Sequence, residues 1–287
     1  MPIELKNVTK RFGQVEALKV EALKDVSVTF EDGRMYGLLG NNGAGKSTLM
    51  NLVAGRIFPT AGKIQIDGEG TDCDRALGKL FLMSEGNLFP EDMRVKTALD
   101  LAGGFYSRYD IAEAEALAER FELNTKSKIN KLSAGYGSIF KLVLALSCNA
   151  PYLLLDEPVL GLDAQHREMF YKLLLEKYAA NRCTVIFSTH LIYEAANLVE
   201  HAVVLRKGRV LKDAPVEELT AGAHTVSGPA AVDEYLRGRT VLNETCIGGL
   251  KTASVEGEPG QVPAGLEMAG INLQDYFIAL MDKEDRT

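Results

Sequence analysis

Residues 40–48 carry the clearest chemical pattern in this chain of 287 residues. They read Gly-Asn-Asn-Gly-Ala-Gly-Lys-Ser-Thr and fit the phosphate-binding pattern G-x-x-x-x-G-K-[ST], with Gly40, Gly45, Lys46 and Ser47 at its fixed positions. Glycines let the backbone curl so that successive N–H groups point inward and hold phosphate oxygens. Lys46 is placed to reach the β- and γ-phosphates, and the Ser47 hydroxyl to bind Mg²⁺. We therefore predict a binding loop for a nucleoside triphosphate, in preference to a glycine-rich turn that holds nothing.

Two predicted elements hold this loop in position. Residues 35–39 form a short apolar run typical of a buried strand, and residues 48–54 have the spacing of a helix. The loop then runs into a helix N-terminus, whose positive dipole end favours bound phosphate. The residues expected to contact the nucleotide are Gly40, Asn41, Asn42, Gly43, Ala44, Gly45, Lys46, Ser47 and Thr48.

Composition narrows the class of protein. Hydrophobic residues make up 46% and charged residues 25% of the chain, as is usual for soluble globular proteins. The net charge of -7 disfavours a protein that binds nucleic acid through a broad basic face. The four cysteines form no C-x-x-C pair, so we expect reduced thiols in the cytosol. We see no N-terminal signal pattern and no apolar run that spans a bilayer, so function at a membrane requires a partner that does.

Apolar patterns on both sides of the loop indicate an α/β fold. Ile3–Val8 and Val26–Phe30 alternate apolar and polar residues, which predicts half-buried strands of an antiparallel sheet. Tyr152–Leu155 and Thr184–Phe187 are uninterrupted apolar runs, as expected for parallel strands buried on both faces. Residues 85–150 are mainly helical in pattern and are predicted to form an insertion between strands of the main sheet.

The predicted architecture is a P-loop NTPase core with a mainly parallel sheet, an antiparallel β subdomain, and a helical insertion subdomain. It occupies residues 1–220, with a helix expected after His190, through Leu198. Residues 221–287 are predicted to form a small α+β C-terminal module, with helices near 229–236 and 271–281 and a strand near 250–255.

A short tandem repeat lies between the first two predicted strands. Val15–Lys19 reads Val-Glu-Ala-Leu-Lys and is repeated at once as Val20–Lys24. A repeat of this length is too short for a solenoid. We interpret it as a duplication tolerated in a connecting loop, because loop length has a small entropic cost.

Further motifs follow the phosphate loop in a fixed order. Leu132-Ser133-Ala134-Gly135-Tyr136 precedes a predicted helix, the run from Leu153 ends in Asp156-Glu157-Pro158, and Gly161-Leu162-Asp163 and Ser188-Thr189-His190 come next. No Asn-Lys-x-Asp guanine-reading motif is present, which disfavours a GTPase. The ordered set resembles the nucleotide-binding subunit of an ATP-binding cassette (ABC) transporter, over about residues 2–219.

The resemblance implies a role for each catalytic position. Asp156 corresponds to the carboxylate that holds Mg²⁺ with Ser47, and Glu157 to the general base that orients the attacking water. Strand alternation would turn these neighbouring side chains to different partners. His190 corresponds to the switch histidine that contacts the γ-phosphate, and Lys46 acts with them in catalysis.

The resemblance also implies residues that bind adenine and residues that serve a second subunit. Phe12 corresponds to the aromatic that stacks on adenine, although an aromatic at a strand end is also a common core residue. Ser133 and Gly135 belong to the signature motif, which completes the ATP site of the opposite subunit. Asp163 belongs to the loop through which paired subunits communicate. The expected partners are ATP, Mg²⁺, a second ABC ATPase subunit and an integral-membrane permease, with no direct nucleic acid.

This sequence departs from the family pattern at three positions. Ala134 stands where glycine is usual and requires a negative φ, and Tyr136 stands where glutamine is common. Glu85 stands where the family usually has the glutamine that links Mg²⁺ to the transmembrane partner. A carboxylate still binds Mg²⁺ but adds negative charge beside the triphosphate, so we expect altered metal dependence or coupling.

The short tail resembles that of bacterial drug- and peptide-antibiotic export ATPases. These ATPases work with a separate permease, which holds them on the inner face of the cell membrane. The segment from Glu85 to Val95 is expected to receive that permease. Leu88, Phe89 and Met93 either make this contact or pack in the core. The alternative functions are those of a soluble ABC ATPase that acts in assembly, such as iron–sulfur cluster assembly, or on nucleic acid or the ribosome.

Overall fold

The computed structural model of the chain describes residues 2–13, 20–86, 89–229 and 231–286. The chain forms two compact units, one of Met1–His190 with Ala202–Asp213 and one of Leu191–His201 with Ala214–Thr287. Every residue assigned above to nucleotide or metal lies in the first unit. In the described part of the chain, no helix combines the length and the apolar character needed to cross a bilayer.

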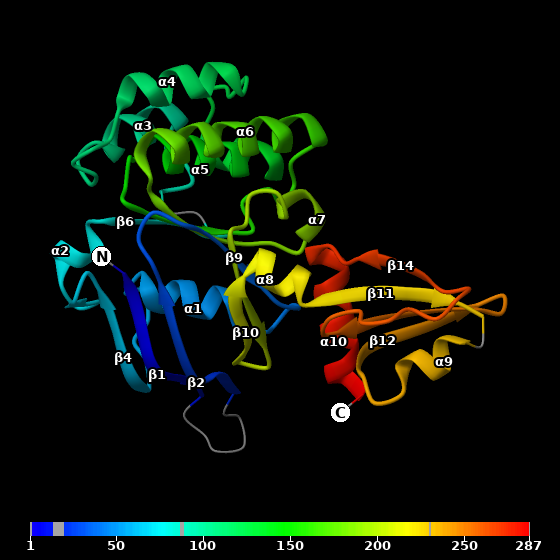
Figure 1. Cartoon of the computed structure of the whole chain (residues 1–287). Coiled ribbons are helices and arrows are strands. Elements are labelled where there is room, and N and C mark those ends of the chain that lie inside the picture. The colour runs from blue at the N-terminus through cyan, green and yellow to red at the C-terminus, as the bar shows by residue number, and fades with distance from the viewer. Residues whose placement is uncertain (1, 14–19, 87–88, 230, 287) are drawn as a thin grey trace. The chain divides into compact units, whose positions relative to one another are not determined.

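A six-stranded sheet with the order β10-β9-β3-β8-β7-β6 runs through the first unit (Figure 1). β3, β8, β7 and β6 pair in parallel, which confirms the mainly parallel core sheet. β3, β7 and β8 are buried along their whole length, and this burial explains their uninterrupted apolar sequences. The strands are β3 (Met35–Leu39), β6 (Leu80–Met83), β7 (Tyr152–Asp156), β8 (Thr184–Ser188), β9 (His201–Arg206) and β10 (Arg209–Pro215).

The predicted antiparallel sheet is also present, with the order β2-β1-β4-β5. The phosphate-loop helix α1 lies between the two sheets, because its apolar side chains share one core with strands of both. This burial fixes the axis along which the helix dipole acts. The elements are β1 (Ile3–Phe12), β2 (Val20–Phe30), α1 (Lys46–Val53), β4 (Ala61–Ile66), β5 (Glu69–Gly70) and α2 (Asp74–Leu77).

The tandem repeat is where the expectation from sequence is wrong. Its second copy, Val20–Lys24, lies in β2 and not in a loop, and Val20 pairs with Phe12 of β1. Register shifts along this strand pair, together with a φ of 51° at Asp25, interrupt the alternation of buried and exposed residues. The pattern that identifies a strand is therefore hidden in the sequence. The first copy lies outside the described residues.

The helical insertion packs on α6 beside the core sheet, and these helices lie together in green in Figure 1. Helix α5 of the insertion contacts α3 and α4 of the same insertion, and α6 and the edge strand β6 outside it. The elements are α3 (Val95–Ala102), α4 (Ile111–Arg120), the 3-10 turn η2 (Ile129–Lys131), α5 (Ala134–Ser147) and α6 (Ala164–Asn181).

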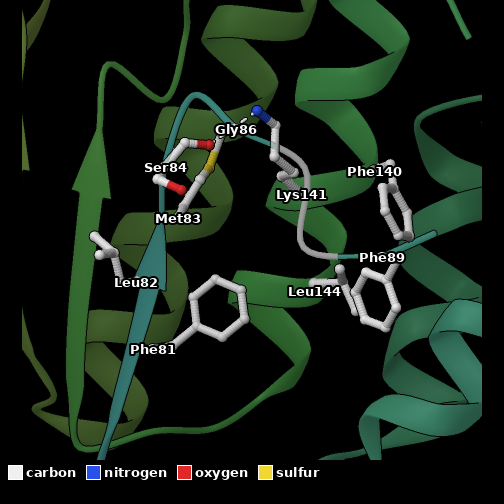
Figure 2. A pocket seen from close by; sticks show the side chains of 9 residues that line it. All are labelled: Phe81, Leu82, Met83, Ser84, Gly86, Phe89, Phe140, Lys141 and Leu144. Atoms are coloured by element: carbon white, nitrogen blue, oxygen red, sulfur yellow. Dashed lines mark hydrogen bonds between the residues drawn. The ribbon is translucent and has the colours of Figure 1, made fainter. Parts of the chain in front are cut away.

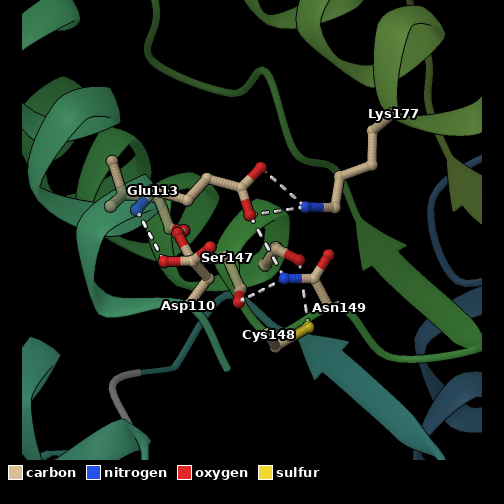
Figure 3. A network of polar contacts seen from close by, with 8 residues as sticks. Asp110, Glu113, Ser147, Cys148, Asn149 and Lys177 are labelled. Carbon is tan, nitrogen blue, oxygen red and sulfur yellow. Dashed lines mark hydrogen bonds and ion pairs between the residues drawn. The ribbon is translucent and has the colours of Figure 1, made fainter. Parts of the chain in front are cut away.

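A polar network ties this insertion to α6 (Figure 3). Lys177 of α6 is nine-tenths buried, and its Nζ donates to both carboxylate oxygens of Glu113 of α4 at 2.8 Å. Asn149, at a φ of 51°, donates through Nδ2 to Glu113 Oε2 and to the Ser147 carbonyl oxygen, each at 3.2 Å. Asp110 caps α4, since its carboxylate accepts from the Glu113 backbone N–H at 3.0 Å. The Glu113 carboxylate thus joins α4, α6 and the turn before β7.

Replacing Lys177 should lower the stability of this junction without affecting the nucleotide site. Lys177→Met leaves the partly buried Glu113 carboxylate without its cation, which costs about 1–3 kcal/mol. Urea unfolding should show this loss, whereas Lys172→Met, at an exposed position on the same helix, should change stability by less than about 0.5 kcal/mol. Equal stability of the two variants would contradict the assignment.

The second unit contains a four-stranded antiparallel sheet with the order β12-β13-β11-β14. One strand near 250–255 was predicted and four are present, because most side chains of β12 and β14 are exposed and show no apolar face. The helix after His190 is also shorter than predicted. The elements are α7 (Ile192–Ala195), α8 (Val216–Ala221), β11 (Ala223–Gly228), α9 (Ala231–Leu236), β12 (Thr240–Ile247), β13 (Leu250–Glu256), β14 (Glu267–Gly270) and α10 (Leu273–Arg286).

Candidate nucleotide site

The phosphate loop connects β3 to α1. Gly45, immediately before α1, has a φ of 111°, and a Cβ there would lie 2.8 Å from the Ala22 carbonyl oxygen. Only glycine satisfies both conditions. The Lys46 side chain folds back along the loop, and its Nζ donates to the carbonyl oxygens of Gly40 at 2.7 Å and Asn41 at 3.4 Å. The ammonium group is therefore held against the loop that would surround the phosphates.

The adjacent carboxyl ends of β7 and β8 position the acidic residues. Asp156, the last residue of β7, faces Ser188, the last residue of β8, in the sheet register. The Ser188 hydroxyl donates to Asp156 Oδ1 at 2.6 Å and accepts from the Glu157 backbone N–H at 2.9 Å. One buried hydroxyl thus positions both acids. Ser188 belongs to the Ser188-Thr189-His190 motif but was given no role of its own; its place at the end of the next parallel strand is the signal that could have identified it.

The Glu157 side chain is paired with His190. Glu157 has a φ of 48°, so it leaves the strand in a left-handed conformation. Its Oε2 lies 2.8 Å from His190 Nδ1 and 3.4 Å from the His190 backbone nitrogen. A left-handed turn, and not the alternation of a continuing strand, therefore separates the carboxylates of Asp156 and Glu157. A non-glycine residue in this conformation is strained, and such strain is common at functional sites.

An open groove of about 1080 Å³ brings these parts together. It contains most of the nucleotide, metal and catalytic residues predicted from sequence. It also contains residues that sequence analysis did not assign, among them Val20 and Ala22 of the repeat. The predicted residues in its wall are Phe12, Asn42, Gly43, Ala44, Gly45, Lys46, Ser47, Thr48, Glu85, Asp156, Glu157 and His190.

Phe12 lies at the edge of this groove. It ends β1 and is 41% exposed, so it is not a core aromatic. Lys10 Nζ lies 4.9 Å from the centroid of its ring. A flat aromatic face open to the groove provides a surface on which a purine can stack.

Oxygen groups that fit a divalent cation line the same groove. Asp156 keeps one carboxylate oxygen beyond the one held by Ser188, and Ser47 presents an exposed hydroxyl at the start of α1. Glu85 adds a second carboxylate. Mg²⁺ is typically bound by one or two carboxylates together with phosphate oxygens and water, and this donor set fits that requirement.

Glu85 lies in a turn, Ser84–Gly86, which follows β6 and is held by Lys141 and Arg56. Figure 2 shows Lys141 reaching this turn from its helix. Lys141 of α5 donates through Nζ to the carbonyl oxygens of Ser84 at 2.9 Å and Glu85 at 2.8 Å. Arg56, just after α1, donates through Nη1 to Ser84 Oγ at 2.8 Å and through Nη2 to the Leu82 carbonyl oxygen at 3.4 Å. Burial lowers the pKa of both basic side chains, and the Glu85 charge partly offsets this for Lys141.

Phe89 and Met93 are half-buried, and Leu88 lies outside the described residues. The Phe89 ring centroid lies 5.8 Å from that of Phe140 of α5, so this side chain packs on the signature helix.

The signature residues and Asp163 do not line the groove of their own chain. Ser133 caps α5, its hydroxyl accepting from the Tyr136 backbone N–H at 3.3 Å, and Ala134 is the first helical residue, with the negative φ that alanine requires. Asp163 caps α6, and its carboxylate lies 2.8 Å from His166 Nδ1. Hydrogen bonds from the backbone and side chain of His166 lower the pKa of Asp163.

Gly135 joins these two helix ends. A Cβ on Gly135 would lie 2.7 Å from the Gly161 carbonyl oxygen, so a larger residue would force the backbones apart. Ser138 adds a hydrogen bond from its hydroxyl to the Leu160 carbonyl oxygen at 2.9 Å. The signature motif and the segment that leads to Asp163 therefore form one surface.

Comparison with known proteins agrees with this geometry. The profile of the ABC transporter family matches residues 23–160. The chain is 32% identical to the Nod factor export ATP-binding protein I of Burkholderia lata, an alignment that covers 74% of this chain and 70% of that protein. It is 30% identical to the taurine import ATP-binding protein TauB of Jannaschia sp., over 74% of this chain and 81% of that protein.

A solved structure shows the same fold. The dimeric, post-hydrolysis structure of the ATP-binding cassette MJ0796 bound to ADP and Pi superposes with a TM-score of 0.66 at 27% identity, covering 74% of this chain and 98% of that chain. Together with the phosphate loop, Asp156, Glu157 and His190 in one groove, these similarities establish the family. The chain belongs to the ABC transporter family, as an ATP-binding and ATP-hydrolysing subunit of a transporter.

Proposed function

We propose that this subunit drives a separate integral-membrane permease by closing and opening as a dimer around ATP, and that the transport is export. The observation that carries the catalytic part is the single groove in which the phosphate loop meets Glu157 and His190. The subunit would then act on the inner face of the cell membrane, held there by the permease.

The proposed catalytic roles follow from the contacts. Lys46 and the amides of the loop bind the β- and γ-phosphates, and Glu157 orients and polarises the attacking water. A carboxylate only accepts hydrogen bonds, so His190 Nδ1 donates to Glu157. A second hydrogen bond, from Nε2 to a γ-phosphate oxygen, requires the imidazolium form of the ring, in which both nitrogens carry a proton. Mg²⁺ bound by Ser47, Asp156 and Glu85 would neutralise charge on the phosphates. Phe12 stacks on the adenine.

The signature residues act on the ATP of a second subunit. Ser133 and Gly135 lie at the N-terminus of α5, a helix of 14 residues that favours an anion at this end. They are absent from the groove of their own chain, and the related cassette MJ0796 is dimeric. Asp163, on the same surface, would report the state of one site to the other. The partner is a second copy or a similar ATPase subunit.

The permease and the direction of transport rest on separate support. The described residues contain no membrane-spanning helix, and relatives include both import and export ATPases. Export is favoured by the resemblance of the tail, with the sequence of residues 271–277 at its end, to the C-terminal module of bacterial drug- and peptide-antibiotic export ATPases.

Affinity isolation from detergent-solubilised membranes tests the permease. The tagged chain is expected to carry a stoichiometric polytopic membrane protein, identified by mass spectrometry. Recovery only with ribosomal, nucleic-acid-binding or cluster-assembly proteins would contradict the proposal. Once the permease is known, ATP-dependent uptake of its substrate into inside-out vesicles would support export, and uptake only into right-side-out vesicles would contradict it.

Glu85→Gln should change the metal dependence of turnover and not abolish it. The amide remains a possible ligand, but it lacks the charge that attracts the cation. We expect the Mg²⁺ concentration for half-maximal ATPase activity to rise by about two- to tenfold. Glu91→Gln, at an exposed position in the same segment, serves as the control. Unchanged metal dependence and unchanged stimulation by the permease would show that Glu85 does not bind the metal.

A further inference from the structure

The side chain of Lys141 is unusual for its position on α5. Its neighbours Phe140 and Leu144 are buried, and the side chains that surround this part of the helix are mainly apolar (Figure 2). Lys141 is half-buried there, and an ammonium group is disfavoured by loss of water. A methionine or leucine would fill this space without that penalty. The amine must therefore have a polar function that outweighs its desolvation.

The contacts of Lys141 identify this function. Its Nζ donates to the carbonyl oxygens of both Ser84 and Glu85, which are 57 and 56 residues away in the chain. These two bonds orient the turn whose side chain, Glu85, lines the ATP groove. The turn is also held by Arg56, which follows the phosphate-loop helix. The turn that carries Glu85 is thus held by two cations, Lys141 from α5 and Arg56 from the segment after α1.

Charge gives a second reason for a cation at this place. Glu85 brings a negative charge toward a site that must receive a triphosphate, and the resulting repulsion weakens binding. The Glu85 charge acts on Lys141 in a way that favours its charged form. The Lys141 ammonium group, within hydrogen-bond distance of the Glu85 backbone, compensates part of the negative charge of the Glu85 side chain. A glutamine at this position would carry no such charge.

We propose that Lys141 is a positioning residue that holds the Glu85 turn on the signature helix and compensates the Glu85 charge, so that a carboxylate is accepted beside the triphosphate. The proposal rests on the proposed placement of Glu85 at the metal. It also places the Glu85 turn and the signature motif on one helix, since Lys141, in the middle of α5, lies eight residues, or about 12 Å, along the axis from Ser133.

A double-mutant cycle on the full chain tests the proposal without depending on turnover. The dissociation constant for ATP is measured by calorimetry, with Mg²⁺ and with EDTA, for the parent, Lys141→Met, Glu85→Gln and the double variant. Lys141→Met should weaken Mg²⁺-ATP binding about three- to tenfold in the presence of Glu85. In the Glu85→Gln background the same substitution should weaken binding by less than about twofold, because the charge to be compensated is gone. Lys141→Arg keeps both charge and donors and should restore binding to within about twofold.

A purely structural role makes a different prediction. If Lys141 only packs α5, Lys141→Met weakens binding equally in both backgrounds, and this result would overturn the proposal. No change in either background would overturn it as well. Lys177→Met provides the matched control, since it also removes a lysine from the helical layer but should lower unfolding stability without changing ATP affinity.

The cycle separates this proposal from the metal assignment. If Glu85→Gln alone leaves the Mg²⁺ dependence unchanged, the metal role of Glu85 fails. The coupling between Lys141 and Glu85 in EDTA then still shows whether the lysine compensates the charge, and additive effects there would reject it.

Discussion

Glu157→Gln is expected to lower ATP turnover about 100- to 10,000-fold while ATP binding is retained. Glutamine has the shape of glutamate. In the parent, His190 Nδ1 lies 2.8 Å from Glu157 Oε2, and the carbonyl oxygen of glutamine can still accept this hydrogen bond. It has no negative charge with which to polarise the attacking water. The variant should therefore bind ATP and close, but not complete the cycle.

The measurement has two readouts. Release of phosphate gives the rate, and light scattering after gel filtration with ATP gives the mass, which should shift from one subunit to a dimer that persists. Glu122→Gln is the matched control, since Glu122 also has a positive φ, of 53°, but is exposed and lies outside the groove. Hydrolysis by Glu157→Gln at the parent rate would show that another group is the base.

The strand ends that carry the candidate catalytic residues could be predicted because their signal is local. The apolar run before Asp156 identifies a buried parallel strand, and the carboxyl end of such a strand is where polar side chains gather in an α/β sheet. The same argument located His190 after Thr184–Phe187. What it could not give was the conformation of Glu157, because a positive φ in a non-glycine residue leaves no mark on the sequence.

Contacts between side chains and backbone atoms could not be predicted from the sequence for another reason. Lys141 and Arg56 bind carbonyl oxygens, and every residue has a carbonyl, so no residue type at the acceptor reveals the partner. The repeat was misassigned for a related reason. Val20–Lys24 forms a strand through its pairing with β1, and the irregular register of this pairing hides the strand pattern in the sequence.

Lys46→Ala should remove most ATP affinity, with a dissociation constant about 30- to 1000-fold higher than that of the parent, as expected for the loss of charge-assisted bonds to phosphate. Lys46 is only 7% exposed, and its ammonium group is held by the Gly40 and Asn41 carbonyl oxygens. Its position is therefore set by the folded loop before any phosphate arrives, and little side-chain entropy remains to be lost on binding.

The control for Lys46→Ala is Lys63→Ala, which removes the same charge from an exposed position on β4, outside the groove. Calorimetry with Mg²⁺-ATP measures affinity, and thermal unfolding without nucleotide shows whether the loop still folds. Retained ATP affinity in a folded Lys46→Ala variant would contradict the assignment of this loop. Because Glu157→Gln should bind ATP without hydrolysing it and Lys46→Ala should do neither, only Glu157→Gln should show the ATP-dependent shift to a dimer. That contrast would separate binding from chemistry in the proposed cycle, in which closure depends on the phosphates held by Lys46 and opening on the water activated by Glu157.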